Sequence, residues 1–290
     1  MKINFINNSY RRFYSSNKKE IDNAVKRCLS EGQLTLRKDV WDLEKNIAKY
    51  VGVKYGAGVN SGTDALFLSL LALGIGKGDE VITVSNTFIA SISEIVRVGA
   101  RPVLVDIGDD YLIDPNEVRK AITKRTKAII AVHLSGDTAN MDALKQFGLP
   151  IIEDAAQAFG ATINGQKVGS IGVTGCFSFY PAKLMGGIGD AGALVTNDES
   201  VYEKVKLLRD HNLIGKSKDV SIDEYGMNSR LDSVQAAYLN VKMEQIQDIL
   251  SFREESARKY EELLSGVDEV KLPLKREGRV WQDYIIRAER

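Results

Sequence analysis

The stretch VITVSNTFIASISEIVRVGARPVLVD, residues 81–106, has the pattern of a strand, a helix and a second strand in direct succession. VITVS at 81–85 and RPVLVD at 101–106 are short apolar runs of the kind found in strands buried on both faces. FIASISEIVRVG at 88–99 lies between them, has the length of a helix and ends at a glycine. This alternation predicts parallel strands connected through a helix.

The same alternation extends from about residue 60 to residue 200. Within it, further helices are predicted at 63–73, 115–122 and 140–147, and further strands at 127–134, 150–154, 175–180 and 192–196; another helix, at 38–50, precedes it. We therefore predict an α/β fold, namely a three-layer α/β/α domain with a mostly parallel sheet.

The pattern changes after Arg230. Residues 231–264 are predicted to form one long helix or two in sequence, and residues 267–274 and 280–290 one or two strands. The chain ends on that second strand with no helix to cover it. We expect a large domain with N-terminal helices over residues 1–235 and a small, incomplete C-terminal α+β domain over residues 236–290.

Composition excludes several classes of function. The chain of 290 residues has 39 Lys and Arg against 39 Asp and Glu, so no net charge attracts nucleic acid or anionic membranes. Its first residues lack the apolar core of a signal peptide, and no apolar run approaches the roughly 20 residues that cross a bilayer. Two cysteines predict a reducing cytoplasm, and with only two histidines they make no convincing metal site.

GAGVNSG at 56–62 has glycine spacing similar to a dinucleotide fingerprint, but its context differs. A Rossmann loop follows a strand, and an acidic residue ends the next strand. Here a predicted helix and a short segment precede the glycines, whereas Asp79 and Glu80 come before the next strand. This context argues against nicotinamide binding.

The overlapping stretch SGTDAL, residues 61–66, opens an apolar helix. Free main-chain N–H groups, the close approach that Gly62 permits, and the hydroxyls of Ser61 and Thr63 together suit a phosphate. The alternative is a plain Ser or Thr cap of the helix, which is favoured if the stretch is considered alone.

IIEDAAQ at 151–157 ends a buried strand in two acidic residues. Ligands of open α/β sheets bind beyond the carboxyl ends of the strands, where Asp154 is expected. The alternative is that one of the acids caps or pairs structurally.

Lys183 stands among aromatic, small and glycine residues in SFYPAKLMGGIGDAG, residues 178–192. Ser178 and Tyr180 alternate with phenylalanines, so they share one face of the strand that leads to the lysine. Desolvation lowers the pKa of a lysine, and the neutral amine can form a Schiff base with a carbonyl. The alternative is a lysine whose ammonium reaches water from a flexible loop.

A phosphate cradle, a carboxylate at a strand end and a reactive lysine together match the needs of pyridoxal phosphate (PLP). The lysine holds the aldehyde, the cradle holds the phosphate and the carboxylate keeps the ring nitrogen protonated. Phe88, at the start of a predicted helix, could provide an aromatic plate against the ring, although a core phenylalanine is the alternative.

At these residues the sequence resembles the DegT/DnrJ/EryC1/StrS family of PLP-dependent nucleotide-sugar aminotransferases. The similarity extends from about residue 17 to residue 287. Seven motifs in order carry it: VNSGTDAL, GDEVITVSNTFIAS, GARPVLVDI, ITKRTKAIIAVHLSG, IIEDAAQAFGA, FSFYPAKLMGGIGDAGALVTND and NSRLDSVQAAYL. The resemblance implies a type I aminotransferase fold and a homodimer with shared active sites.

The resemblance also implies a role for each site residue. Lys183 bonds the cofactor and moves the proton between the substrate carbon and the cofactor. Asp154 pairs with the pyridinium nitrogen, Gln157 hydrogen-bonds the ring hydroxyl and Phe88 stacks on the ring. The phosphate is held by Gly62, Thr63 and Ser178 together with Asn228 from the partner subunit. Arg230 lies near that contact, and its role is open.

The implied reaction moves an amino group from an amino acid, with L-glutamate the expected donor, to a nucleotide-linked keto sugar. The lysine motif favours amination at C3 of a dTDP-linked 3-keto-6-deoxyhexose over amination at C4. The alternatives are a regulatory relative that binds PLP without turnover and a PLP-dependent sugar dehydratase. The dehydratases have histidine in place of the lysine, so Lys183 argues against that activity.

Three departures from the family concern substrate binding more than cofactor binding. Family members usually continue beyond this chain's C-terminus. Glycine is usual where Leu36 stands, and a histidine is common where Gln282 stands.

Overall fold

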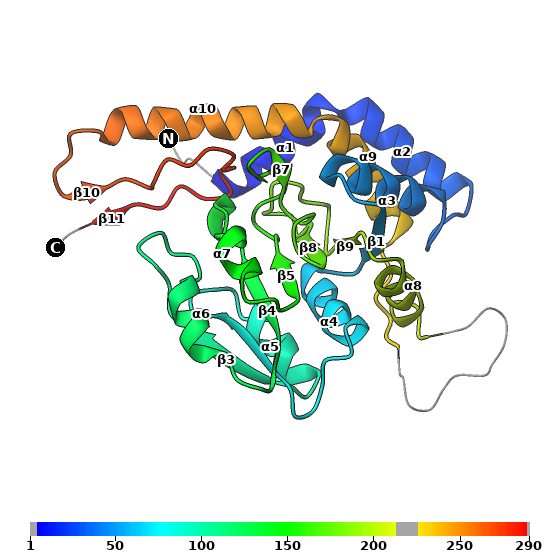
Figure 1. The fold of residues 1–290 in the computed structure, drawn as a ribbon. Helices are drawn as coiled ribbons and strands as arrows, with labels where there is room; N and C mark the ends of the chain where they lie inside the picture. Colours follow the sequence, from blue (N-terminus) through cyan, green and yellow to red (C-terminus); the bar gives the residue numbers. More distant parts are fainter. Residues whose placement is uncertain (1–4, 213–225, 289–290) are drawn as a thin grey trace.

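The structure, a computed structural model, describes residues 5–212 and 226–288. A seven-stranded sheet lies at its centre, with helices on both faces (Figure 1). The strands of this sheet are β1 (Tyr55–Val59), β2 (Glu80–Val84), β3 (Arg101–Val105), β4 (Thr126–Val132), β5 (Ile151–Asp154), β8 (Thr174–Ser178) and β9 (Gly192–Thr196). The helices are α1 (Phe5–Ser16), α2 (Lys18–Ser30), α3 (Lys38–Val51), α4 (Gly62–Ala72), α5 (Ala90–Arg97), α6 (Pro115–Ala121), α7 (Met141–Lys145), α8 (Glu199–Leu208), α9 (Ser233–Glu244) and α10 (Ile246–Leu264), with a 3-10 turn η1 (Leu134–Gly136).

The strand order in the sheet is β1-β9-β8-β5-β4-β2-β3. β8, β5, β4, β2 and β3 pair in parallel, whereas β9 pairs antiparallel with both β8 and β1. Only β9 therefore runs against the other strands of this sheet. The carboxyl ends of β1, β2, β4, β5 and β8 lie at one edge, which is where ligands bind in open α/β sheets. The predicted mostly parallel α/β fold is confirmed.

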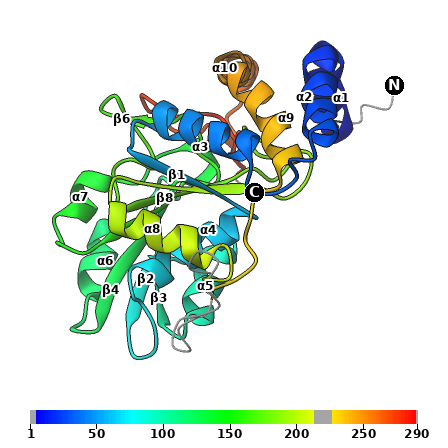
Figure 2. The same cartoon turned by 90° about the vertical axis from the view of Figure 1, so that its right-hand side faces the viewer.

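Helices cover the sheet on two sides. In Figure 2, α3 lies on one side of β1 and β8, and α4 and α8 lie on the other. Alternate residues of β9 belong to two separate clusters: Leu194 packs with the α4 side, and Ala193 and Val195 pack with the α3 side. This alternation shows why the strand is apolar throughout, since both of its faces are buried.

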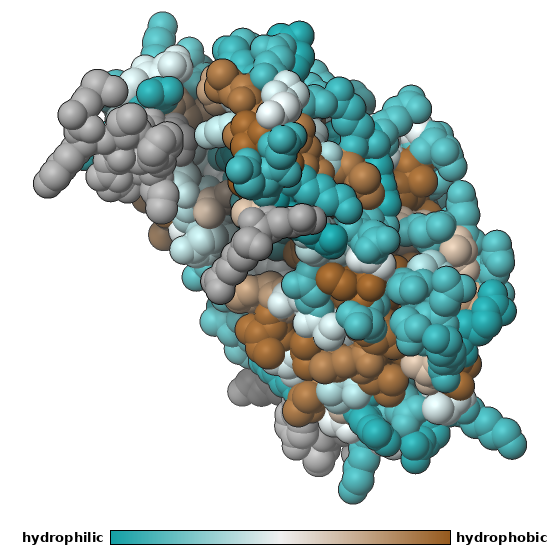
Figure 3. All heavy atoms as spheres, turned by 90° about the vertical axis from the view of Figure 1, so that its left-hand side faces the viewer, coloured by the Kyte–Doolittle hydropathy of each residue, from teal (hydrophilic) through white to brown (hydrophobic). Residues whose placement is uncertain are grey.

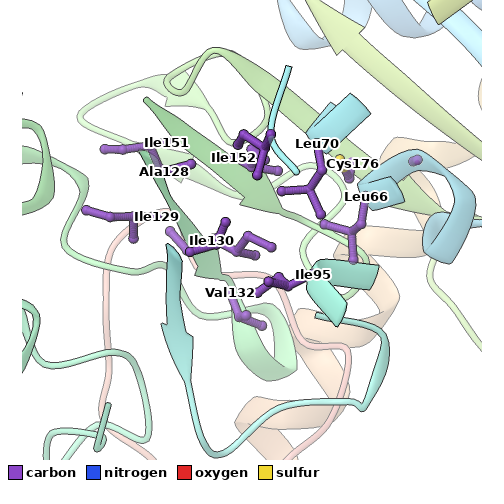
Figure 4. Packing of buried hydrophobic residues seen from close by; sticks show 14 of the residues in the cluster. Leu66, Leu70, Ile95, Ala128, Ile129, Ile130, Val132, Ile151, Ile152 and Cys176 are labelled. Atoms are coloured by element: carbon purple, nitrogen blue, oxygen red, sulfur yellow. The ribbon is translucent and has the colours of Figure 1, made fainter. Parts of the chain in front are cut away.

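The larger cluster joins helix to sheet beneath the carboxyl edge. Figure 4 shows Leu66 and Leu70 of α4 near Cys176 of β8, with Ile130 and Ile152 from the neighbouring strands. Each of these side chains is no more than 2% exposed. This packing fixes α4 against the sheet and thereby sets where its N-terminus lies.

The β2–α5–β3 unit forms as expected, with a shorter helix. The helix was predicted over 88–99, but α5 spans Ala90–Arg97, because Phe88 lies in the loop that leads into it. The strand predicted over 175–180 spans Thr174–Ser178, so Tyr180 lies just beyond its end. The predicted alternation is confirmed there: Phe177 is 1% and Phe179 0% exposed, whereas Tyr180 is 54% exposed.

A fully buried carboxylate, that of Glu153 in β5, ties the carboxyl edge together. It accepts hydrogen bonds from the main-chain N–H groups of Gly169, Ile171 and Gly172 at 2.8, 2.7 and 2.6 Å. His133, directly after β4, lies 3.0 Å away through Nε2. Burial alone would raise the pKa of Glu153, but His133 and the N–H groups of Gly172 and Gly169 lower it below its ordinary value.

The C-terminal region begins with two helices rather than one. α9 ends at Glu244 and α10 begins at Ile246, so the second of the two predicted arrangements is observed. Beyond α10, β10 (Val270–Lys271) pairs antiparallel with β11 (Arg287–Ala288), and a second small hairpin joins β6 (Thr162–Ile163) to β7 (Gln166–Lys167). The expected division between residues 235 and 236 falls within α9, which packs on α2 and α3, and it stays a prediction.

The surface mixes hydrophilic side chains with grouped hydrophobic ones, as one face shows in Figure 3. Across residues 5–212 and 226–288, no helix combines the length and the apolar character that crossing a membrane requires. The same residues contain no group of three or more His, Cys, Asp or Glu placed to hold a metal ion.

Close contact between α3 and β1 depends on Gly56. A Cβ atom there would lie 2.7 Å from the main-chain oxygen of Glu44. Gly56→Ala should therefore push α3 from the sheet and lower the free energy of unfolding by about 1–3 kcal/mol, measured from urea denaturation. Gly76→Ala is the control, since its nearest atom would be 3.5 Å away; equal losses in the two variants would contradict this packing.

Candidate active site

A cavity of about 570 Å³ opens at the carboxyl edge of the sheet. It is lined by seven of the eight predicted site residues: Gly62, Thr63, Phe88, Asp154, Gln157, Ser178 and Lys183. The volume is in the range of about 300–1,000 Å³ that small-molecule sites have. A larger and more open groove of about 1080 Å³ lies against α1 and α2 and contains none of them. Because the predicted site residues line the smaller cavity, we take that cavity as the candidate active site.

The N-terminus of α4 forms one wall of this cavity. Ser61 caps the helix, since its Oγ accepts a hydrogen bond from the main-chain N–H of Asp64 at 3.1 Å. The N–H groups of Gly62 and Thr63 belong to the same first turn, where helices leave donors for an anion. A Cβ on Gly62 would lie 2.8 Å from the Cβ of Ser178. Capping and the expected anion site therefore coexist, because they use different residues.

Asp154 lies at the end of β5 with its carboxylate held from two sides. Its Oδ2 accepts a hydrogen bond from Ser91 Oγ at 2.7 Å, and its Oδ1 accepts one from Ala156 N–H at 3.2 Å. Thr87 Oγ1 lies 2.9 Å from Ser91 Oγ. Because the Ser91 hydroxyl donates to Asp154, the Thr87 hydroxyl donates to Ser91. The hydrogen bonds from Thr87 to Ser91 and from Ser91 to Asp154 therefore orient a residue that is only 6% exposed.

The two acids of IIEDAAQ have separate roles. Glu153 pairs structurally with His133, and Asp154 lines the cavity. The ligand-site interpretation and the structural interpretation of that motif therefore both apply, each to a different acid. Sequence reasoning missed Ser91 and Thr87, although both stand beside Phe88 in the NTFIAS motif. Their spacing of four residues on a helix entry was the available signal.

Gln157 is anchored by its amide oxygen, which accepts the main-chain N–H of Ser135 at 2.8 Å. Its amide nitrogen is therefore the group left to donate toward a ligand. His133 also lines the cavity and was missed by sequence reasoning. Its Nδ1 accepts Ala139 N–H at 3.1 Å, so its Nε2 carries the hydrogen that it donates to Glu153.

Lys183 reaches the cavity from the loop after β8. Burial lowers the pKa of its amine, while the carboxylates of Asp154 and Asp283 partly oppose that change. Within residues 5–212 and 226–288, its Nζ makes no hydrogen bond. A desolvated, weakly paired amine is one whose neutral, nucleophilic form becomes accessible near neutral pH.

Phe88 is 65% exposed at the cavity, so the alternative of a core phenylalanine is wrong. An exposed ring beside the carboxylate and the amine is available to stack on a flat ligand.

Two residues of the expected phosphate region lie outside the cavity. Asn228 is exposed and forms an isolated bridge with Asp210. Arg230 donates from Nη1 to Asp210 Oδ1 at 2.9 Å. A role for Asn228 in the partner's site stays a prediction.

Leu36 has a main-chain φ of 46°, in the left-handed region. Glycine adopts this conformation without the clash that a Cβ causes, which gives a physical reason for glycine being usual there.

These residues fit PLP. The α4 N-terminus and Ser178 could hold its phosphate, Asp154 its ring nitrogen, Gln157 its ring hydroxyl and Lys183 its aldehyde. The fit rests on the close approach at Gly62, where a side chain would fill the cradle, and on a carboxylate already oriented by Ser91.

Replacing Asp154 by Asn should lower the pKa of Lys183 further, because its carboxylate is one of two charges that raise that pKa. In the protein freed of cofactor, Lys183 should then be acylated faster at pH 7, measured across pH by peptide mass spectrometry. Asp190→Asn is the control, since Asp190 lines the same cavity without being a cause of the shift. A slower reaction in Asp154→Asn would contradict this arrangement.

Comparison with known proteins gives consistent results. The model of the DegT/DnrJ/EryC1/StrS aminotransferase family matches residues 15–290. The chain is 41% identical over 284 residues to the pleiotropic regulatory protein of Geobacillus stearothermophilus, covering 95% of this chain and 76% of that protein. It is 40% identical over 284 residues to the dTDP-3-amino-3,4,6-trideoxy-alpha-D-glucose transaminase of Streptomyces venezuelae, covering 96% of this chain and 74% of that enzyme.

The crystal structure of S. venezuelae DesV in complex with a ketimine intermediate matches with a TM-score of 0.90 at 40% identity. The match covers 97% of this chain and 76% of that chain. The family match includes almost the whole sequence and every residue of the cavity. This chain belongs to the DegT/DnrJ/EryC1/StrS aminotransferase family and is a PLP-dependent aminotransferase.

Proposed function

We propose that the chain transfers an amino group from L-glutamate to a nucleotide-linked keto sugar, with a dTDP-linked 3-keto-6-deoxyhexose as the favoured class. The observation that carries the proposal is the desolvated Lys183 in one cavity with Asp154 and the N-terminus of α4. The S. venezuelae transaminase, named for a dTDP-linked 3-amino sugar, supports the substrate class.

When bound, PLP supplies an aldehyde and an electron-accepting ring that stabilises a neighbouring carbanion. Lys183 would hold the aldehyde carbon of the cofactor through Nζ, and its free amine would move the proton between the substrate carbon and the cofactor. Asp154, oriented by Ser91, keeps the ring nitrogen protonated, which is the condition for the ring to accept electrons.

The remaining residues orient and bind. The N–H groups of Gly62 and Thr63 and the hydroxyl of Ser178 hold the phosphate, and Gln157 donates to the ring hydroxyl. Phe88 covers one face of the ring and excludes water from it. The position of each of these side chains in the lining of the cavity supports its assignment.

We propose further that two chains form a homodimer with shared active sites. Phe88, Ile89, Tyr180 and Ile188 are 65%, 62%, 54% and 56% exposed, and Phe88 and Tyr180 line the cavity. Exposed apolar side chains of this size are typical of a surface that a partner covers. Asn228, outside the cavity of its own chain, would then complete the partner's phosphate site.

We place the reaction in the cytoplasm. Cys28 and Cys176 are both free and buried, which suits a reducing compartment.

Incubation with PLP and reduction with borohydride should attach the cofactor to Lys183, seen as a mass increase on its peptide. Lys183→Ala should abolish the attachment, whereas Lys167→Ala, at a partly buried lysine outside the cavity whose pKa is also lowered, should leave it intact. Attachment of PLP to a different lysine would contradict the assignment of Lys183 as the residue that bonds the cofactor. Added L-glutamate should convert the bound cofactor to its amino form; a spectrum unchanged by any amino acid would favour the regulatory alternative.

A mixture of Lys183→Ala and Asn228→Ala chains tests the shared site. In a mixed dimer one site combines both substitutions and the other has neither. Random mixing of two inactive variants should therefore restore about a quarter of the wild-type activity if the dimer is two-fold symmetric. No recovery after subunit exchange, verified by mass spectrometry, would show that Asn228 does not act across the interface.

A further inference from the structure

The main-chain N–H and C=O of Lys183 are hydrogen-bonded within the loop that carries the lysine. The main-chain N–H of Lys183 donates to Tyr180 O at 2.8 Å, and Gly186 N–H donates to Lys183 O at 2.8 Å. The N–H of Leu184 on one side of the lysine needs another partner, because Leu184 is buried, whereas Ala182 on the other side is exposed.

Gln282 supplies a partner on each side of the lysine. Its Nε2 donates to Ala182 O at 3.0 Å, and Leu184 N–H donates to its Oε1 at 3.1 Å. Its amide therefore clasps the residue before and the residue after Lys183. The side chain is 7% exposed, so water does not compete freely for these hydrogen bonds.

We propose that Gln282 is a positioning residue that fixes the direction in which the Lys183 side chain leaves its loop. This inference rests on the proposed function, in which Lys183 bonds the cofactor. Gln282 does not line the cavity; it acts through the peptide groups that flank the lysine.

The main chain at and beside Gln282 is itself held by hydrogen bonds. Arg253 Nη1 donates to Gln282 O at 3.3 Å, and Val280 N–H donates to Gly136 O at 3.0 Å. A Cβ on Gly136 would lie 1.9 Å from Val280 O and 3.0 Å from Gln282 N, so the segment lies directly on the turn after β4. The clasp thus transmits the position of a packed segment to the lysine loop.

The chemistry of the clasp requires an amide. One group must donate to a carbonyl oxygen while another accepts from an N–H. Glutamate has two acceptors and would set a carboxylate oxygen against Ala182 O. Methionine has similar length and volume but offers neither group.

Gln282→Met is therefore the test, with Gln235→Met as its matched control. Gln235, in α9, accepts Ile188 N–H through Oε1 at 3.0 Å, so the control removes an amide that contacts the same loop away from the lysine. Three measurements are compared: the rate of borohydride-trapped PLP attachment at Lys183, the affinity for pyridoxamine phosphate, and the pH midpoint of Lys183 acylation in cofactor-free protein. Pyridoxamine phosphate fills the cavity without bonding the lysine.

In Gln282→Met, attachment at Lys183 should slow about tenfold, the effect of losing roughly one buried hydrogen bond. Affinity for pyridoxamine phosphate should change less than about twofold, since the cradle is intact. The acylation midpoint should move toward that of an exposed lysine, because a released loop lets water reach the amine. Gln235→Met should leave all three unchanged, and Gln282→Glu should reproduce the slower attachment.

Two results would overturn the inference. Unchanged attachment and an unchanged acylation midpoint in Gln282→Met and Gln282→Glu would show that the clasp does not position the lysine. Parallel losses of attachment, pyridoxamine phosphate affinity and thermal stability would show a merely structural role. If wild-type protein attaches no PLP at Lys183, the proposed function fails, and the acylation midpoint, which needs no cofactor, still decides the role of Gln282.

Discussion

The active edge of the sheet depends on one ionised group that water does not reach, the carboxylate of Glu153. Placing such a charge in a protein interior is unfavourable unless hydrogen bonds replace those of water. Three main-chain N–H groups and His133 make that replacement. These partners come from the turn before β8 and from the end of β4. The same carboxylate therefore holds three neighbouring strands in register where the cofactor residues emerge.

Period-two alternation in β5 then separates structure from chemistry. Glu153 faces its hydrogen-bonding partners while the next residue, Asp154, faces the cavity. Ser91 stabilises that orientation from α5, and Thr87 stabilises Ser91. Asp154, Ser178 and the residues of the α4 N-terminus are thus held on strand ends and a helix, which position side chains more precisely than loops do. Lys183, Phe88 and Gln157 are presented by loops, and the loop of Lys183 has contacts of its own.

Local sequence patterns were enough to predict the elements and the edge at which they meet. Apolar runs such as VITVS and the helix between 81 and 106 predicted parallel strands, and parallel strands necessarily bring Asp154 and Ser178 to one edge. The pattern could not show that β9 runs antiparallel, since a strand buried on both faces looks alike in either direction. The predicted start of α5 was also wrong. The apolar pattern from residue 88 onward included Phe88 in the helix, whereas Phe88 lies exposed in the loop that leads into it.

Contacts between distant residues were beyond the reach of such patterns. The hydrogen bond from Ser91 to Asp154 joins residues 63 positions apart, and His133 meets Glu153 across 20 positions. No periodicity encodes these pairs, because they arise only when separate elements pack. The motifs nevertheless contained the residues: NTFIAS includes Ser91, and the two acids of IIEDAAQ were recognised as having two alternative uses.

The contacts of Gln282 with the lysine loop span 98 and 100 positions of the chain. During translation, which adds about 5–20 residues per second, the loop therefore leaves the ribosome on the order of ten seconds before the residue that completes it. The nascent protein would assemble its sheet early and acquire an ordered reactive lysine late.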